Sequence, residues 1–259
     1  MKIVAPSSNL GDNLWITPAL KYCNYTVQTA DEERCRKISS IYKNLTNVEF
    51  VEGLNHYKLD KRIHNTKQIF SQIGIDYNNK NLIPEIKLDQ SEIDWAKDFL
   101  KQYENPIVII NDNSGSSDPN NQRALFVLPP RTIIQQIATY LSNKFTVLQF
   151  GLAENFYRNG YSNFTPLENA HYIRGLDIRQ LASCYHVIGK YIGGDTGDYH
   201  LMLAVGGQCL TLIPSESECI GYIYNNLLYL EDMWNGEEIR VNYLNYLDIE
   251  NIKTKVKNI

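Results

Sequence analysis

Short apolar runs alternate with segments of helical spacing along most of the chain, and this alternation constrains the fold more than any other feature. The apolar runs predict strands at residues 2–6, 25–29, 48–51, 107–110, 145–150, 171–174, 187–192 and 209–213. Helical spacing predicts helices at residues 14–23, 31–43, 60–75, 93–103, 133–141, 178–184 and 199–205. Strands that alternate with helices form parallel sheets, so we expect an α/β protein.

The alternation restarts after Glu104, Asn105 and Pro106, which break the preceding predicted helix. A chain of 259 residues makes one large domain or two small ones. The restart favours two α/β domains, at residues 1–105 and 106–259.

Composition excludes several classes of protein. With 43% hydrophobic and 21% charged residues, the chain can bury a core and is not expected to be disordered. Its net charge of −4 argues against a generally basic surface for nucleic acid. The longest apolar runs fall far short of the about 20 residues of a spanning helix, so we expect no stable membrane insertion. The first residues are too polar for a secretory signal, which predicts a cytoplasmic protein.

The strongest local signal is GGDTGDYHLMLAVGG at residues 193–207, which follows an apolar run and leads into a predicted helix. Backbone N–H groups at a helix start bind anions, so Thr196 and Gly197 could hold a phosphate. His200 could meet the same phosphate, and Asp195 could cap the helix or orient the loop. An ordinary helix, capped by Asp195 and with His200 on the surface or in the core, explains the pattern equally well.

A second signal is the polar loop SSNLGDN at residues 7–13, after the first predicted strand. In open α/β sheets, ligands bind beyond the carboxyl ends of strands, where Asp12 would lie. Its carboxylate could act as a general base on an acceptor hydroxyl. Spacing alone favours the simpler alternative, in which Asp12 caps the helix that begins near Asn13.

A weaker constellation follows the fourth predicted strand. The polar loop at residues 111–117 precedes Arg123 and Arg131, which suit a pyrophosphate, and Glu154 could accept hydrogen bonds from a ribose or base. Taken singly, an Arg or Glu at such a position is more often a solvated surface residue than a ligand contact. The chain lacks G-x-G-x-x-G after its first strand, G-x-x-x-x-G-K-[ST] and any Cys/His cluster, so we expect neither a dinucleotide dehydrogenase, nor a P-loop, nor a metal site.

Three stretches together resemble glycosyltransferase family 9, the ADP-heptose heptosyltransferases. They are IVAPSSNLGDNLWITPAL at residues 3–20, IRGLDIRQLASCYHVIGKYIGG at residues 173–194 and DTGDYHLMLAVGG at residues 195–207. The resemblance implies a GT-B fold, with two Rossmann-like domains facing a cleft. The acceptor would lie on residues 1–105, a shortened N-terminal domain. The donor would lie on residues 106–259, whose last helix can return to the N-terminal domain.

The resemblance also implies roles for individual residues. Asp12 would be the catalytic base, and Thr196 and Gly197 would contact the donor diphosphate. Asp195 and His200 would support that loop or the sugar. The remaining assignments are Arg123 at the position of the family's usual Lys, Glu154 as a nucleotide contact, and Ser8, Asn9, Gly11 and Asn13 in the acceptor-side loop.

The implied activity is that of an inverting, metal-independent glycosyltransferase without a cofactor. It would move a heptose or other hexose-like sugar from a nucleoside diphosphate sugar, ADP-linked in the family, to a hydroxyl acceptor. The acceptor stays open between a glycan, a lipid-linked sugar, a protein and modified DNA. Two alternatives use the same scaffold: a nucleotide-sugar epimerase or hydrolase, and a non-catalytic nucleotide-sugar-binding protein.

Overall fold

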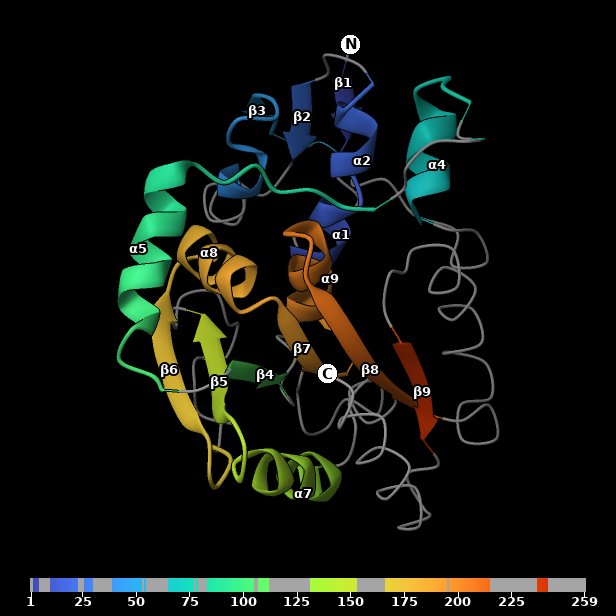
Figure 1. Cartoon of the computed structure of the whole chain (residues 1–259). Helices are drawn as coiled ribbons and strands as arrows, with labels where there is room; N and C mark the ends of the chain where they lie inside the picture. Colours follow the sequence, from blue (N-terminus) through green and yellow to red (C-terminus); the bar gives the residue numbers. More distant parts are fainter. Residues whose placement is uncertain are drawn as a thin grey trace.

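The computed structural model of the chain consists of two parallel sheets with helices between and beside them (Figure 1). It describes residues 2–4, 10–22, 26–29, 39–52, 54, 65–76, 78, 83–104, 107–111, 131–152, 166–194, 196–214 and 237–241. Within these residues, no helix is both long enough and apolar enough to cross a membrane. The α/β class expected from the alternation is therefore confirmed.

The smaller sheet is built from the N-terminal part of the chain. Its strands are β1 (Lys2–Val4), β2 (Thr26–Thr29) and β3 (Val48–Phe50), paired in parallel in that order. The helices connecting them or following them are α1 (Leu10–Leu14), α2 (Thr17–Leu20), the 3-10 helix η1 (Ser39–Tyr42) and α4 (Asn65–Gln72).

The larger sheet has six parallel strands. In spatial order they are β6 (His171–Leu176), β5 (Thr146–Leu152), β4 (Ile107–Asn111), β7 (Lys190–Gly193), β8 (Gln208–Pro214) and β9 (Glu237–Val241). Every neighbouring pair is parallel. The chain winds outward from β4 to one edge and then from β7 to the other, which is the order of a Rossmann sheet. The switch point between β4 and β7 is where such sheets bind ligands.

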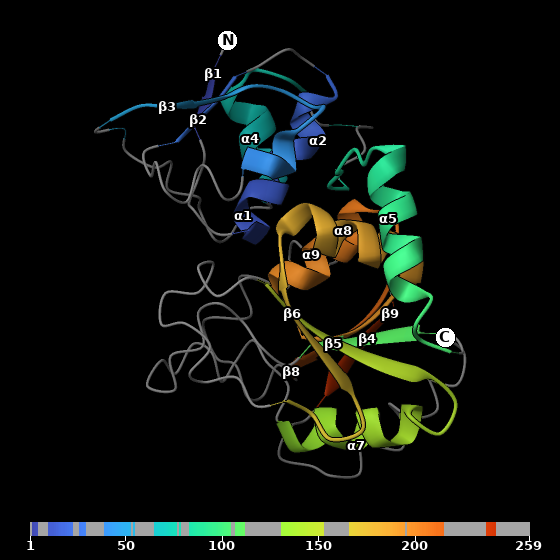
Figure 2. The same cartoon turned by 90° about the vertical axis from the view of Figure 1, so that its left-hand side faces the viewer.

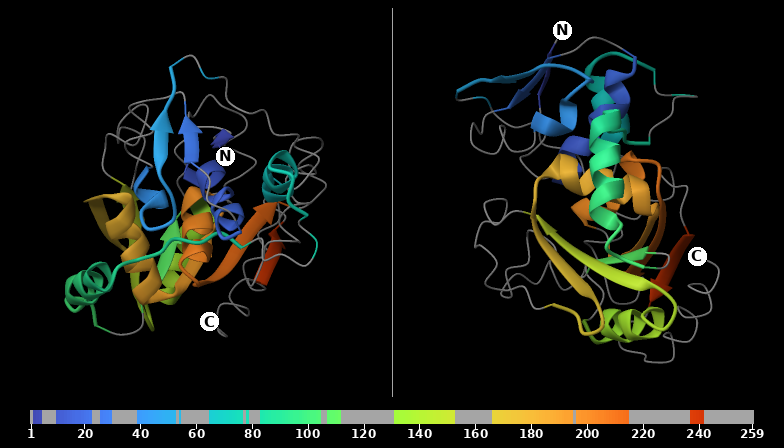
Figure 3. Two further views of the ribbon diagram at one scale, coloured as in Figure 1. Left: turned by 90° about the horizontal axis from the view of Figure 1, so that it is seen from above. Right: turned by 60° about the vertical axis from the view of Figure 1, so that its left-hand side comes forward.

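Helices cover both faces of the larger sheet. Helix α7 (Arg131–Leu141) lies on one face, and α8 (Ile178–Ile188) and α9 (Gly197–Ala204) lie on the other (Figure 2). Helix α5 (Gln90–Leu100) precedes residue 106 but packs along α8 (Figure 3). The boundary between residues 105 and 106 therefore stays a prediction.

The main apolar core lies between the two sheets. It contains side chains from α1, η1, α4 and α5 together with side chains from α8 and α9, among them Leu14, Tyr42, Phe70, Tyr185 and Tyr199. A second, smaller cluster joins α7 to the other face of the larger sheet. The N-terminal elements thus share one buried core with the helices of the larger sheet.

Several predicted boundaries differ from the structure, and for two of them the reason can be identified. Helix α8 continues to Ile188 because Gly189 ends it in the left-handed conformation (φ 70°), so β7 begins three residues later than expected. The predicted helix at residues 14–23 is two short helices, and the first begins at Leu10 inside the predicted loop. Buried Asn13 and Thr17 make polar contacts there, which a pattern of apolar residues does not detect.

Candidate functional site

The first helix of the chain packs directly against the helix that follows the D-T-G sequence. Helices α1 and α9 meet through glycine on both sides. A Cβ atom added to Gly11 would lie 3.0 Å from His200 Cδ2, and one added to Gly197 would lie 3.3 Å from Leu10 Cδ2. The absence of side chains at these glycines therefore lets the two helices approach closely. This contact brings together the two motifs that were singled out in the sequence.

Helix α9 begins without a capping hydrogen bond from its N-cap side chain. The N-cap is Thr196, so the alternative with Asp195 as the cap is wrong by one residue. Tyr191 Oη donates to Gly194 O at 3.0 Å and lies 3.2 Å from Thr196 Oγ1. Because a phenol has one proton, the Thr196 hydroxyl donates to Tyr191. Thr196 is buried, and its side chain is turned toward β7 rather than over the helix start.

One side of the first turn of α9 is bound to α8. The buried Tyr185 donates a hydrogen bond to Asp198 Oδ1 at 2.9 Å. A carboxylate in the first turn is favourable because the helix dipole is positive there. Asp198 belongs to the D-T-G motif, but Tyr185 stands 13 positions away and no local pattern relates the two residues.

His200 lies in the second turn of α9 and is 4% exposed. Its ring packs edge-on against Trp15 from the N-terminal segment, with centroids 5.2 Å apart, and against Tyr199, with centroids 4.9 Å apart. This is the position expected for a core histidine, the simpler of the two alternatives. A contact of His200 with a sugar or phosphate stays a prediction.

Asn13 is fully buried and bound to a residue that the sequence did not point to. Its Oδ1 accepts a hydrogen bond from Tyr42 Oη at 2.7 Å, and its carbonyl oxygen lies 3.1 Å from the same hydroxyl. Asn13 follows Asp12 in α1, so this contact orients the backbone beside the predicted base. The Asp12 side chain lies outside the described residues, as do Ser8, Asn9, Arg123, Glu154 and Asp195.

The turn before α9 lies at the switch point of the larger sheet. Asn111, at the end of β4, pairs with Gly193, at the end of β7. The predicted polar loop at residues 111–117 therefore starts beside the turn that leads to Thr196. Arg131, at the start of α7, donates a hydrogen bond to Pro166 O at 2.7 Å.

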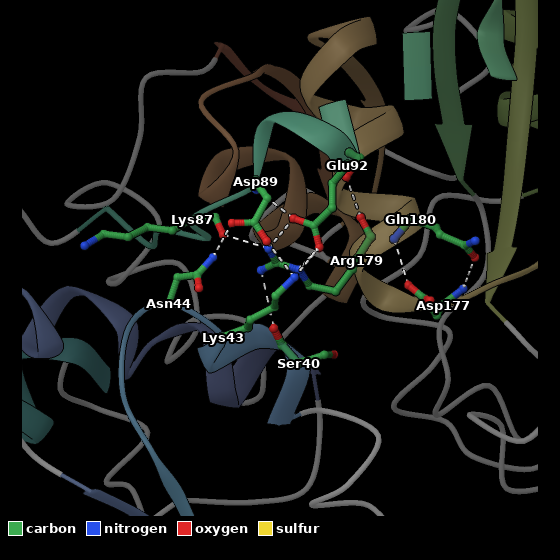
Figure 4. A network of polar contacts seen from close by, with 10 residues as sticks. Ser40, Lys43, Asn44, Lys87, Asp89, Glu92, Asp177, Arg179 and Gln180 are labelled. Carbon is green, nitrogen blue, oxygen red and sulfur yellow. Dashed lines mark hydrogen bonds and ion pairs between the residues drawn. The ribbon is translucent and has the colours of Figure 1, made fainter. Parts of the chain in front are cut away.

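A second polar cluster joins three segments through Arg179 (Figure 4). Arg179 is 7% exposed and donates to Glu92 Oε1 from Nε at 2.9 Å, to Lys87 O from Nη2 at 2.7 Å and to Ser40 O from Nη1 at 3.4 Å. Lys43 Nζ adds ion pairs to Asp89 at 2.6 Å and Glu92 at 3.1 Å. No local sequence pattern predicts this cluster, because its members are far apart in the chain.

Glu92 is ionised over a wide pH range in this cluster. Its partial burial opposes the charge, but hydrogen bonds from Arg179, the Asp89 backbone N–H and Lys43 lower its pKa to about 2. The ordinary value is 4.5. Glu92 is therefore the counter-charge that Arg179 needs at its buried position. Among the residues with described positions, no three His, Cys, Asp or Glu side chains gather closely enough to hold a metal ion.

Comparisons with known proteins give matches among solved structures only; no protein-family model and no curated protein sequence matches this chain. A glycosyltransferase of family 9 from Veillonella parvula aligns with 100% of this chain and 89% of its own, at 12% identity and a TM-score of 0.63. E. coli ADP-heptose LPS heptosyltransferase II aligns with 100% of this chain and 99% of its own, at 11% identity and a TM-score of 0.57.

The E. coli heptosyltransferase WaaC, solved with ADP, aligns with 99% of this chain and 96% of its own, at 12% identity and a TM-score of 0.57. At such low identity the likeness concerns the fold. The chain thus has a mixed α/β structure that matches the GT-B structures of family 9 heptosyltransferases over its full length.

Proposed function

We propose that the protein is an inverting, metal-independent glycosyltransferase that moves a sugar from a nucleoside diphosphate sugar to a hydroxyl acceptor. The main support for this proposal is the contact of α1 with α9. It brings the segment that contains the candidate base Asp12 next to a helix start that is suited to a diphosphate. In this proposal, residues 1–105 and 106–259 form two Rossmann-like domains, and acceptor and donor meet in the cleft between them.

The donor diphosphate would bind at the start of α9. The first-turn N–H groups of Gly197 and Asp198 receive no capping bond from Thr196, and such groups bind phosphate oxygens. This helix start follows β7 at the switch point, the usual ligand position in a Rossmann sheet. Arg123 and Glu154 follow β4 and β5 in the sequence, so both are candidates for nucleotide contacts. The WaaC structure with ADP makes an adenine nucleotide the first candidate.

The chemical step would use Asp12 as the base. Its carboxylate takes the proton of the acceptor hydroxyl, and the acceptor oxygen attacks the anomeric carbon from the face opposite the leaving group. The bond from that carbon to the diphosphate oxygen breaks, and the nucleoside diphosphate leaves with the bonding electrons. The N–H groups at the start of α9 and the Arg123 guanidinium then stabilise the leaving group's charge.

The first experiment is a thermal-shift screen of the protein with ADP, UDP, GDP and their sugar derivatives, since a ligand that binds only the folded state raises the melting temperature. Product analysis with and without acceptors then separates transfer from epimerisation and hydrolysis. If nucleotide sugars bind but no product forms with glycan, lipid-linked, peptide or DNA acceptors, the protein is a binding protein instead.

The second experiment tests the base. Asp12→Asn should abolish transfer and leave the ADP dissociation constant unchanged, because the variant removes the proton acceptor alone. Asp98→Asn, at an exposed carboxylate of α5, is the matched control and should keep full activity. Transfer by Asp12→Asn at the wild-type rate would remove Asp12 from the mechanism.

A further inference from the structure

A single buried hydroxyl connects η1 to α1. Tyr42 is 1% exposed, and its Oη lies within hydrogen-bond distance of both Oδ1 and the carbonyl oxygen of Asn13. Asn13 is itself fully buried, so neither partner has water as a replacement. Tyr42 therefore holds the residue that follows Asp12.

The segment that carries Tyr42 is in turn held by α8 and by the start of α5. Arg179 on α8 donates to the carbonyl of Ser40 in η1, and its other nitrogens bind Glu92 and Lys87 O (Figure 4). Directly after η1, Lys43 and Asn44 bind Asp89, the residue that precedes α5. The guanidinium of Arg179 thus links η1, the segment before α5, and α5 itself.

The opposite side of the N-terminal helices is held by residues 83–89. Glu85 N–H donates to the buried Thr17 Oγ1 of α2 at 2.8 Å. The next residue, Ile86, donates its N–H to Ala204 O at the end of α9 at 2.9 Å. Together with the glycine contacts between α1 and α9, these bonds leave α1 little freedom to shift relative to α9.

We propose that Tyr42 and Arg179 are positioning residues that set the place of Asp12 relative to the donor diphosphate on α9. The inference rests on the proposed function. It assigns a role in catalysis to two buried side chains that would contact neither the donor nor the acceptor. Arg179 suits this role because its planar group donates in three directions at once, which a lysine ammonium on a flexible stem does not reproduce.

Donor binding and base catalysis should respond differently to the loss of the Tyr42 hydroxyl. In the proposed function, donor binding depends on the start of α9, whereas the Tyr42 hydroxyl is hydrogen-bonded to Asn13 in α1. Base catalysis depends on where α1 holds Asp12, and a displacement of about 1 Å can cost roughly 100-fold in rate. Loss of the Tyr42 hydroxyl should therefore lower kcat and leave donor affinity intact.

The test compares Tyr42→Phe with Tyr22→Phe, a tyrosine that is 39% exposed. Tyr42→Phe should lower kcat by about 10- to 100-fold, with an unchanged calorimetric Kd for ADP, when assayed well below its melting temperature. Tyr22→Phe should change neither value. A wild-type kcat in Tyr42→Phe, or equal losses of kcat and ADP affinity, would overturn the proposal.

Arg179→Lys and Arg179→Met extend the test, with Lys101→Ala at an exposed ion pair of α5 as the control. Both Arg179 variants should lower kcat without changing ADP affinity, and the lysine should recover only part of the rate. If neither variant folds, Tyr42→Phe decides alone. A full rescue by lysine would overturn the role of the three-way contact.

Hydrogen exchange separates a failure of this proposal from a failure of the proposed function. If the wild-type protein transfers no sugar, the glycosyltransferase assignment falls, but the backbone amides of Leu14 and Trp15 should still exchange faster in Tyr42→Phe. The amides of α8 should keep wild-type rates. If the α1 amides of Tyr42→Phe exchange at wild-type rates, the positioning role of Tyr42 is overturned, whether or not the protein transfers sugar.

Discussion

Helices α8 and α9 lie on the same face of the larger sheet, and each follows one of its strands, but they begin differently. At the start of α8, Asp177 Oδ1 accepts from Gln180 N–H at 2.8 Å, and Gln180 Oε1 accepts from Asp177 N–H at 3.0 Å. At the start of α9, the Thr196 side chain caps nothing and binds Tyr191 instead. The side chains of α8 thus satisfy backbone N–H groups at its own start. The N-cap side chain of α9 does not, so the first-turn N–H groups of α9 can bind another acceptor.

This difference indicates what each helix start is for. A reciprocal cap satisfies N–H groups that are otherwise orphaned, so the start of α8 stabilises the fold. A start without a side-chain cap, next to glycines and at a switch point, suits an anionic ligand. We therefore expect substitutions at the start of α8 to change stability, and substitutions at the start of α9 to change ligand affinity.

The largest expected effect is that of Arg179→Met in the first turn of α8. Arg179→Met removes the buried partner of Glu92 and leaves that carboxylate with Lys43 alone; breaking such a buried pair costs up to about 3–5 kcal/mol. The loss in the free energy of unfolding is measured by urea denaturation at pH 7. Lys101→Ala, which breaks an exposed pair, should have no measurable effect. A loss in Arg179→Met no larger than that of the control would contradict the structural role of the α8 start.

Acid should remove the contribution of the same ion pair. The pKa of Glu92 is about 2 in the folded state against an ordinary value of 4.5, so its charge stabilises the protein above pH 4.5. That contribution, roughly 3 kcal/mol at most, is lost as the pH falls toward 2. The difference in unfolding free energy between wild type and Glu92→Gln should shrink over this window. A difference independent of pH would show that the Glu92 charge is not what matters.

A smaller change in stability is expected for Asp177→Ala. Loss of an N-cap side chain costs about 1 kcal/mol, which urea denaturation resolves. The ADP dissociation constant of this variant should equal that of the wild type, because α8 begins away from the switch point. Weakened ADP binding in Asp177→Ala would break the distinction between the two helix starts.

The smallest effect on stability is expected for Thr196→Val, which keeps the shape of the side chain. Tyr191 retains its bond to Gly194 O, so the loss should stay below about 1 kcal/mol. ADP affinity should nevertheless fall several-fold, as calorimetry measures, because the bond of the Thr196 hydroxyl to Tyr191 fixes the turn whose N–H groups would hold the diphosphate. Unchanged affinity would remove Thr196 from the donor site and leave the glycine turn as the remaining candidate.

The strands of the larger sheet were predictable where apolar residues dominate them. Val147, Ile192 and Leu210 belong to such runs, and each is buried in the sheet that contains them. Strand β9 was not predicted, because its sequence EEIRV at the sheet edge is mostly charged. Edge strands often carry charges, so an apolar pattern does not identify them.

The candidate site was predictable in its motifs but not in its supports. The segment with Asp12 and the turn with Thr196 stood out by residue type and by their place after strands. Tyr42 and Arg179 did not, because their partners lie 29 and 87 residues away and no local pattern relates them. Such contacts depend on how the two sheets pack, which the sequence determines only through the whole fold.

The contact of α1 with α9 also has a consequence for synthesis on the ribosome. Residues Leu14 and Trp15 bury against a core whose other side includes Leu201 and Met202. An emerging chain therefore completes β1 to β3 long before the helix that covers α1 has been made. Contacts so distant in sequence form late in folding. Until then the nascent N-terminal part exposes an apolar surface, so truncated chains that lack α9 should associate with chaperones or aggregate.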